Sequence, residues 1–295
     1  MKISIYTFAR NAIYYDYHIV DMLLHHLDFA DEIIVNEGYS TDDTFNRIKR
    51  IDSKIKIYKN KWDTANPIEW LARFKNEARK LCTGDWCILL DADEFIPEWE
   101  FSRIRCYLSN TNKVIIPMKY VNFYGNYKVY NKNPKKYNWP EYKYSIHKNI
   151  SDLEIVGDGS NVAFKDASRN VSSSKDESPY ANERFECHHF GVVRKPARLR
   201  EKWHSQALRD RGFYSKEKKS RWDWVPGFVY NLFPYKWTDP QYMDSLAIYE
   251  GPYIKAVRDN PNEFVRDNFE IYEYLLKKEK LKSRLERGRV NHAWL

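Results

Sequence analysis

Asp91 and Asp93 stand two positions apart directly after the apolar run 86–90. Side chains at this spacing leave the end of a strand on the same side. Two unpaired carboxylates so placed repel each other, and a divalent cation would remove the conflict. Oxygen ligands suit Mg²⁺ or Mn²⁺, and substrate phosphates commonly fill the remaining coordination positions. The spacing predicts a metal–diphosphate site, with a solvated acidic turn as the competing interpretation. Removing one carboxylate should then leave the fold intact.

The segments before these carboxylates alternate between strand-like and helix-like patterns. Strands are predicted at 2–8, 31–36, 55–58 and 86–90, and helices at 17–29, 45–51 and 68–82. Strands that alternate with helices of this length form right-handed βαβ units and a parallel sheet. Ligands of open α/β sheets bind beyond the carboxyl ends of the strands. The predicted metal site therefore lies where such sheets bind their ligands.

Four short motifs follow these elements in order, at 8–11, 37–44, 73–78 and 90–95. Together they resemble the nucleotide-sugar half of a glycosyltransferase family 2-like enzyme with the A-type fold. The resemblance implies a Rossmann-like α/β fold, with a mostly parallel central sheet flanked by helices. It also implies a catalytic domain over residues 1–190, in which 1–100 bind the nucleotide sugar and 101–190 bind the acceptor.

The resemblance assigns roles to individual residues of these motifs. Asp93 would coordinate the metal directly, and Asp91 would contact the ribose or reach the metal through water. The residues expected around the nucleotide are Arg10, Glu37, Asp42, Arg73 and Asp91. The family usually has Asp where this chain has Glu37, so the carboxylate is kept on a side chain one methylene longer.

A later motif at 186–196 resembles the His–aromatic–Gly…Arg segment of bacterial members of this family. In A-type glycosyltransferases a histidine from this region often completes the metal site. Adjacent residues of a strand face opposite sides, so only one of His188 and His189 should reach the metal. His189 is the better match because it directly precedes the aromatic residue and Gly191, and His188 is the alternate. A hydrogen-bonded structural histidine is the competing interpretation.

Inversion, which the resemblance favours, requires a carboxylate that deprotonates the acceptor hydroxyl. Asp158, in the Gly-flanked segment 156–159, is one candidate, and Glu141 is another. The sequence does not decide between them. In a retaining enzyme a diphosphate oxygen can serve instead, and then neither residue has this role.

The basic charge of the chain is concentrated in its last third. Residues 1–190 carry 27 basic and 27 acidic side chains, whereas residues 191–295 carry 22 and 14, so that 22 − 14 = +8. This pattern predicts a basic, aromatic-rich and mainly helical C-terminal extension at 191–295, with helices at 196–208 and 262–287. Packing of this extension on the sheet is the favoured interpretation. An anionic lipid surface and a clamp for diphosphate are the alternatives.

Composition sets further limits on partners and location. Aromatic residues make up 16% of the chain, and aromatic faces suit a carbohydrate or glycoconjugate acceptor, although most must serve packing. No apolar run reaches the ~20 residues of a membrane span, and the first residues show no leader pattern. A cytoplasmic protein is therefore expected, with peripheral contact with an anionic membrane as a further option.

The sequence as a whole predicts a metal-dependent glycosyltransferase. It would move a hexosyl or pentosyl group from a nucleotide-diphosphate sugar to a hydroxyl of a glycan, lipid-linked or protein-linked acceptor. A nucleotidyltransferase is the first alternative, but its Gly-rich loop is missing from 7–11. A non-catalytic nucleic-acid-binding protein is the second. It would show a recognisable module, and since none is present no nucleic-acid partner is expected.

Overall fold

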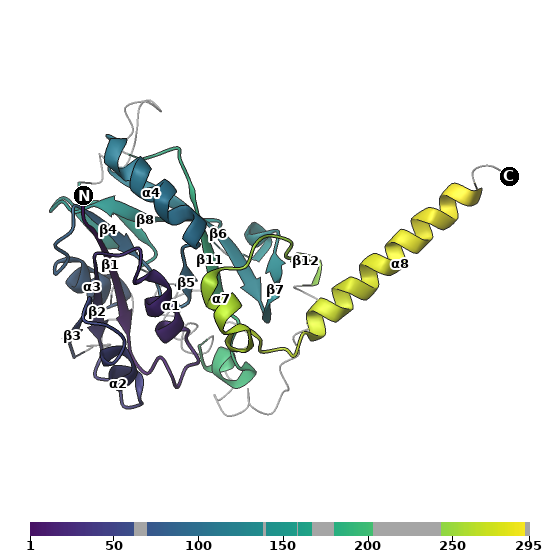
Figure 1. The fold of residues 1–295 in the computed structure, drawn as a ribbon, viewed down its shortest axis with the longest axis horizontal. Coiled ribbons are helices and arrows are strands. Elements are labelled where there is room, and N and C mark those ends of the chain that lie inside the picture. Colours follow the sequence, from purple (N-terminus) through teal and green to yellow (C-terminus); the bar gives the residue numbers. More distant parts are fainter. Residues whose placement is uncertain (62–69, 138–139, 158, 167–179, 203–242, 293–295) are drawn as a thin grey trace, which may run out of the picture.

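A computed structural model describes residues 1–61, 70–137, 140–157, 159–166, 180–202 and 243–292. Within these residues the centre of the protein is a ten-stranded sheet (Figure 1). Its main strand order is β12-β7-β6-β8-β4-β1-β2-β3, and β11 pairs with both β5 and β6.

The first part of the chain builds the parallel half of this sheet. Its elements are β1 (Ile3–Ala9), α1 (Ile19–His26), β2 (Glu32–Glu37), α2 (Thr44–Lys49), β3 (Ile55–Lys59), α3 (Trp70–Arg79) and β4 (Trp86–Leu89). The strands β4-β1-β2-β3 are all parallel to one another. Every strand and helix predicted here is present, so the predicted fold class is confirmed.

Three strands of this half, β1, β2 and β4, are buried on both sides because each face of the sheet is covered there. Ile3 and Ile5 of β1 face the core that contains α1, α2 and α4, whereas Tyr6 faces the core that contains α3. Strands buried on both faces read as continuous apolar runs, which makes these three strands legible in the sequence. β3, at the edge of the sheet, instead alternates apolar and charged residues, and only Ile55 of it is buried.

The second part of the chain continues the sheet with mainly antiparallel strands. Its elements are β5 (Glu94–Phe95), α4 (Glu98–Asn110), β6 (Ile115–Tyr124), β7 (Asn126–Asn131), η1 (Pro134–Tyr137), β8 (Tyr142–Lys148), β9 (Leu153–Val156), β10 (Asn161–Phe164) and β11 (Phe185–Val192). β9 and β10 pair with each other in a separate two-stranded sheet. In the main sheet, β8 is antiparallel to both β4 and β6, and β11 is parallel to β6. The sheet is therefore mixed, with its parallel half at the N-terminal end of the chain.

The described residues of the last third add a strand and several helical segments to the fold. They are β12 (Leu246–Ile248), α7 (Lys255–Asp259), η4 (Pro261–Phe264) and α8 (Glu270–His292), and residues 196–202 are also helical. β12 joins the sheet beside β7, and β11 runs past residue 190. Strands from both sides of the predicted domain boundary thus share one sheet.

The single helix predicted at 262–287 is in fact two elements. Asn268 and Phe269 have left-handed backbone conformations, with φ of 49° and 62°. The Asp267 carboxylate accepts hydrogen bonds from the backbone N–H groups of Phe269 and Ile271, each 3.1 Å long. The chain therefore turns at Asp267, and α8 begins after it.

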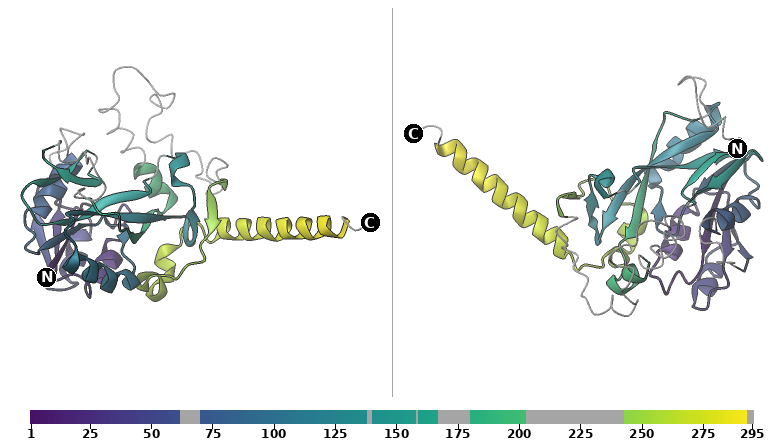
Figure 2. Two further views of the ribbon diagram at one scale, coloured as in Figure 1. Left: turned by 90° about the horizontal axis from the view of Figure 1, so that it is seen from above. Right: turned by 180° about the vertical axis from the view of Figure 1, so that it is seen from behind.

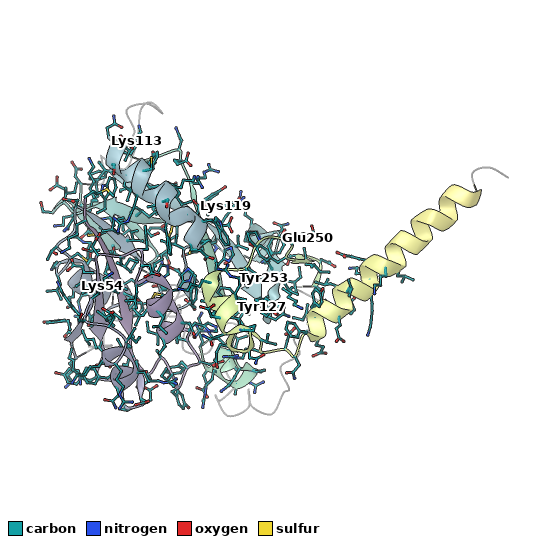
Figure 3. The ribbon with its side chains drawn as sticks, viewed as in Figure 1. Lys54, Lys113, Lys119, Tyr127, Glu250 and Tyr253 are labelled. Atoms are coloured by element: carbon teal, nitrogen blue, oxygen red, sulfur yellow. The ribbon has the colours of Figure 1, made fainter. Side chains whose placement is uncertain are left out.

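Among the described residues, the first turns of α8 are the ones that pack on the protein body. Ile271 and Leu275 are buried, and the helix then extends away from the rest of the molecule in all three views (Figures 1 and 2). At the root of the helix, Tyr127 and Tyr253 pack edge to face with ring centres 4.9 Å apart (Figure 3). No helix in the described part of the chain is long and apolar enough to cross a membrane.

Several histidines are buried in the neutral form. His26 donates from Nδ1 to the Met22 carbonyl oxygen and accepts at Nε2 from the Ile96 N–H, so a second ring proton would break a bond. Burial lowers the pKa of His18 to about 4 and that of His147 to about 3. Burial also lowers the pKa values of His25 and His26.

These histidines predict a loss of stability in mild acid. A histidine whose folded pKa lies below its unfolded value stabilises the fold fully above about pH 6.5, and this contribution is lost as the pH falls toward the folded pKa. At pH 4.5, His18 and His147 together should cost about 5 kcal/mol. Burial raises the pKa of Asp21 to about 6, so its protonation at pH 4.5 stabilises the folded state and offsets about 2 kcal/mol of this loss.

The net loss from these three residues is about 3 kcal/mol, and His25 and His26 add to it. Urea unfolding at pH 7.5 and pH 4.5 measures the difference. The His147→Gln variant is the control, since it should show a shallower pH dependence than the native protein. Equal unfolding free energies of the native protein at the two pH values would contradict the prediction.

Candidate functional site

A tight turn between β4 and β5 carries the two aspartates. The Asp91 N–H donates to the Glu94 carboxylate at 2.9 Å, and the Glu94 N–H donates back to the Asp91 carbonyl oxygen at 3.1 Å. β5 then pairs with β11, which places His189 opposite Glu94. The Phe190 N–H donates to the Asp93 carbonyl oxygen at 2.8 Å. The turn and β11 are therefore fixed relative to each other.

Asp91 is paired with two buried lysines. Lys75 Nζ lies 2.6 Å from Oδ1 of Asp91, and Lys143 Nζ lies 3.3 Å from Oδ2. Burial raises the pKa of Asp91, but the two lysines lower it by a larger amount, so that the pKa lies below its usual value. The Asp91 carboxylate is therefore ionised, and its counter-charge comes from the protein itself. This corrects the premise that the two aspartates lack counter-charges.

Lys143 also holds Glu94, the last residue of the turn. Its Nζ donates to both carboxylate oxygens of Glu94, at 2.9 and 2.7 Å, and the Tyr120 hydroxyl donates to one of them. Burial raises the pKa of Glu94, and Lys143 offsets part of this shift. Lys143, Glu94 and Tyr120 form a buried network beneath the turn.

Asp93 has a separate set of positive partners. The fully buried Arg194 donates from Nη2 to Oδ2 of Asp93, and Lys202 Nζ lies 3.8 Å from the same oxygen. Arg194 also lies over the Tyr17 ring, 3.3 Å from its centre. Burial raises the pKa of Asp93, but these cations lower it well below its usual range. Asp93 is ionised, and its second oxygen, Oδ1, faces His189.

His189 presents an unprotonated ring nitrogen to Asp93. Its Nδ1 donates to the Asn122 side-chain oxygen at 2.7 Å, and Asn122 is oriented by its own bond to the Pro140 carbonyl oxygen at 3.2 Å. Burial lowers the pKa of His189 to about 4 despite the nearby Asp93 charge. The ring is therefore neutral, and its Nε2 lies 4.0 Å from Asp93 Oδ1.

Gly191 leaves the space that the His189 ring occupies. A Cβ at position 191 would lie 2.4 Å from His189 Nε2 and 2.6 Å from Cε1. These atoms belong to a ring held by Asn122, so any larger residue must move the ring.

We expect Gly191→Ala to displace the His189 ring and to weaken metal binding about 10–100-fold, the range seen when a ligand loses its support. Calorimetric titration of Mn²⁺ in the presence of a nucleoside diphosphate measures the effect. The melting temperature of the metal-free variant is the control for folding. Native Mn²⁺ affinity in Gly191→Ala would show that the ring does not take part.

His188 lies on the opposite side of β11. Its Nε2 is 2.5 Å from the Glu186 carboxylate and 3.2 Å from the Tyr249 hydroxyl, and its ring packs against Trp99 and Phe123. These partners differ from those of Asp93. His188 thus has the surroundings of a structural histidine.

Asp93 and His189 fit one divalent cation as a pair of ligands. Metal–ligand distances of about 2.1 Å place two ligands of one ion about 3–4 Å apart, which includes the 4.0 Å gap seen here. Fixing the other ring nitrogen by a hydrogen bond is the usual way a ligating histidine is oriented. No group of three or more His, Cys, Asp or Glu residues that could hold a metal occurs in the described residues. Ions of this kind are commonly completed by substrate phosphates and water.

Two of the residues predicted around the nucleotide are engaged within their own loop. The fully buried Glu37 carboxylate accepts from the backbone N–H groups of Ser40 at 2.6 Å and Tyr39 at 3.2 Å. Asp42 accepts from the backbone N–H groups of Tyr14 at 2.7 Å and Thr44 at 3.0 Å. Both carboxylates shape the loops at the ends of β1 and β2.

The two predicted arginines lie at exposed positions. Arg10 is exposed at the end of β1. Arg73 is exposed on α3, with Nε 3.8 Å from the Glu77 carboxylate and its guanidinium over the Phe74 ring. Lys75, two residues later on α3, is the residue of this motif that contacts Asp91.

Of the two candidates for the catalytic base, the structure describes Glu141 but not Asp158. The Glu141 carboxylate pairs with Lys135 at 2.9 Å, and this bond lowers the pKa of Glu141. Asp158 lies outside the described residues. Its neighbour Gly159 accepts a 2.8 Å hydrogen bond at its carbonyl oxygen from Lys75, which also pairs with Asp91.

The sequence analysis missed the cations of the site: Lys75, Lys143, Arg194 and Lys202. Lys75 had a readable signal, because Ala72, Lys75 and Ala78 share the buried face of α3 by helical spacing. Arg194 lies inside the 186–196 motif, but nothing in the motif indicates its partner. Lys143 and Lys202 have no local signal.

The sequence model of glycosyl transferase family 2 matches residues 18–169, more than half of the chain. The chain belongs to glycosyl transferase family 2. The family membership confirms the predicted family, and the protein is a glycosyltransferase. The matched range contains Asp91, Asp93 and Lys143 but ends before His189 and Arg194. A search of curated proteins finds no match.

The chain is similar to several solved structures at low identity and with TM-scores below 0.5. Staphylococcus aureus TarS, residues 1–349, is 15% identical over 83% of this chain and 79% of that chain, with a TM-score of 0.40. Its UDP-GlcNAc complex gives the same identity and coverage with a TM-score of 0.41. A Pyrobaculum calidifontis mannosyltransferase in complex with GDP-Man and Mn²⁺ is 17% identical over 41% of this chain and 35% of that chain, with a TM-score of 0.33.

Proposed function

We propose that this family 2 glycosyltransferase uses a nucleotide-diphosphate sugar and a divalent cation, Mn²⁺ or Mg²⁺. The acceptor is a hydroxyl of a glycan or glycoconjugate, and the transferred group is a hexosyl or pentosyl unit. The observation that carries this proposal is the pair formed by Asp93 Oδ1 and the neutral Nε2 of His189, 4.0 Å apart. Both lie at the carboxyl edge of the sheet, where α/β folds bind their ligands.

In this proposal, Asp93 and His189 hold the cation, and His188 does not. When bound, the cation supplies Lewis-acid stabilisation of the charge on the leaving diphosphate. Arg194 keeps the Asp93 carboxylate in place from the buried side. Lys202 is partly exposed and lies 3.8 Å from Asp93, so its positive charge can bind a diphosphate.

Asp91 has the role of orienting the nucleotide. Its side chain is 29% exposed although two lysines hold it, and a ribose hydroxyl would approach this exposed part. Direct metal coordination by Asp91 would require it to leave Lys75 or Lys143. Glu37 and Asp42 shape the loops next to Asp91 through their hydrogen bonds to backbone N–H groups. Arg10 and Arg73 are exposed beside these loops.

We assign the base of an inverting reaction to Asp158 rather than Glu141. Support comes from Gly159, whose carbonyl is tied through Lys75 to Asp91, and from the pairing of Glu141 with Lys135. A base that deprotonates the acceptor typically contributes 10²–10⁴-fold to the rate. Asp158→Asn is therefore expected to lower turnover about 10²-fold or more with donor binding unchanged, and Glu141→Gln is the matched control. Equal turnover in the two variants would remove this assignment.

A thermal-shift screen tests the donor class. Nucleoside diphosphates and their sugars are added with and without Mn²⁺, because a ligand that binds the folded state raises the melting temperature by mass action. We expect one nucleotide to raise it in the presence of Mn²⁺ and to do so much less in excess chelator. The same shift with and without the metal would contradict the metal-dependent part. No shift with any nucleotide would contradict the donor class.

A further inference from the structure

The C-terminal helix has two parts with different surroundings. At its root, Ile271 is fully buried and Leu275 is 5% exposed, both within a cluster that includes Tyr124 and Val129. The Asp267 carboxylate, which accepts hydrogen bonds from the Asn126 side chain at 2.9 Å, fixes the entry of the helix. Residues 277–281 are all exposed, and beyond its root the helix lies away from the described protein body in every view (Figures 1 and 2). Within the described part of the chain the root serves packing, and the part from residue 277 onward, called here the projecting part, extends away from it.

Large apolar side chains are exposed at the end of the root and in the projecting part. Tyr274, at the end of the root, is 46% exposed, and Leu281, in the projecting part, is 60% exposed. Seven residues make about two helical turns, so these two side chains lie on the same side of the helix. Lys277 and Lys278 are exposed between them. An apolar stripe flanked by lysines is the pattern of a helix that lies in a membrane interface.

The charge of this segment points to an anionic partner. Residues 277–292 contain 7 basic and 2 acidic side chains, so that 7 − 2 = +5. A second copy of the same helix would bring like charges together. A nucleic acid would satisfy the charge but would leave the apolar stripe uncovered. An anionic lipid surface matches both, because its headgroups pair with the lysines and its acyl boundary covers Tyr274 and Leu281.

Aromatic groups at the root extend this surface toward the body. Lys128 Nζ lies 4.7 Å from the Phe269 ring centre and 4.9 Å from the Tyr272 ring centre. All three side chains are partly exposed. Tyr272 has a polar hydroxyl at its edge and Lys128 reaches past both rings, and such tyrosines and lysines are found at the level of lipid headgroups.

We propose that the projecting part of α8, with its aromatic root, binds the surface of an anionic lipid bilayer without crossing it. The basic residues supply attraction at long range, and Tyr274 and Leu281 enter the headgroup–acyl boundary. This surface is separate from the donor site, and its binding does not depend on the donor, on the metal or on catalysis. In this proposal, the positive charge of the last third of the chain serves to bind anionic lipid.

Vesicle co-sedimentation of the full chain tests the proposal. Vesicles of phosphatidylcholine alone are compared with vesicles that contain phosphatidylglycerol, at low and at high salt. We expect binding only to the anionic vesicles, with loss at about 1 M salt, where the screening length falls to about 3 Å. Failure of the full chain to bind anionic vesicles, or equal binding to neutral ones, would overturn the proposal.

Two full-chain variants separate charge from apolar contact. The triple variant Lys277→Glu, Lys278→Glu, Lys280→Glu should bind anionic vesicles roughly 100-fold more weakly. Leu281→Ser should weaken binding about 10-fold with the same salt dependence. The matched control is Lys49→Glu, Arg50→Glu, Lys80→Glu, which removes the same charge from exposed positions on or next to α2 and α3, and it should reduce binding much less.

Each variant is checked for folding by its melting temperature, which these exposed positions should leave near the native value. Equal weakening by the α8 triple variant and the control triple would show that only net charge matters and would overturn the assignment to α8. Sedimentation as a dimer that the Leu281→Ser variant loses, without vesicle binding, would identify a second copy as the partner. Salt-sensitive retention by RNA without vesicle binding would identify a nucleic acid. Either result would overturn the lipid proposal.

Discussion

Replacing Asp93 with alanine is expected to remove transfer activity and also to weaken the fold. Loss of a group that supports charge stabilisation in the transition state typically costs about 10²–10³ in rate. The same change leaves the fully buried Arg194 without its carboxylate, and breaking a buried ion pair costs about 3–5 kcal/mol. Turnover with a donor sugar and urea unfolding measure the two effects. The two-carboxylate interpretation, in which removing one carboxylate is harmless, predicts no loss of stability.

A double variant separates chemistry from folding. Asp93→Ala combined with Arg194→Met removes both charges and should regain much of the lost stability, because a buried pair replaced by apolar groups is often neutral. Its activity should stay as low as that of Asp93→Ala. Native stability in Asp93→Ala alone would show that Arg194 does not depend on Asp93. Recovery of activity in the double variant would show that Asp93 acts only through folding.

Replacing Lys143 with methionine is expected to destabilise the protein by about 3–5 kcal/mol. Lys143 is buried between Asp91 and Glu94, and it donates to both oxygens of the Glu94 carboxylate. Asp91 would keep Lys75 as a partner, whereas Glu94 would keep only neutral donors such as Tyr120. The cost should therefore arise mainly from an unpaired charge on Glu94.

Urea unfolding of a matched pair tests this cause. Adding Glu94→Gln to Lys143→Met removes the orphaned charge and should restore more than half of the lost free energy. A cost below about 1 kcal/mol for Lys143→Met would contradict the buried network. A double variant no more stable than Lys143→Met would show that the loss comes from packing around position 143.

The parallel half of the fold could be predicted from the sequence because its signals are local. β1, β2 and β4 are short continuous apolar runs, β3 alternates apolar and charged residues, and each helix has one apolar face, so these patterns can be read directly. The start of α8 could not be read in this way. It depends on Asp267, whose side chain turns the chain through two left-handed residues, and the apolar spacing of the segment runs on across that turn.

The carboxylates of the site could be predicted, and most of its cations could not. Short sequence motifs contain Asp91, Asp93 and His189, and the spacing within these motifs is what predicts a metal site. Lys143 lies 52 residues from Asp91 along the chain, and Arg194 lies 101 residues from Asp93, so only the fold brings them together. The expected repulsion between the aspartates was wrong for the same reason. The composition shows that the chain has many lysines and arginines, but it does not show which carboxylate each one pairs with.

Calorimetric titration of Mn²⁺ into the protein saturated with its nucleoside diphosphate tests the central claim most directly. The native protein is compared with the Asp93→Asn, His189→Ala and His188→Ala variants. The account predicts that Asp93→Asn and His189→Ala each weaken Mn²⁺ binding at least about 10-fold, whereas His188→Ala leaves it within about twofold of native. Native affinity in His189→Ala, or a larger loss in His188→Ala than in His189→Ala, would contradict the placement of the metal between Asp93 and His189.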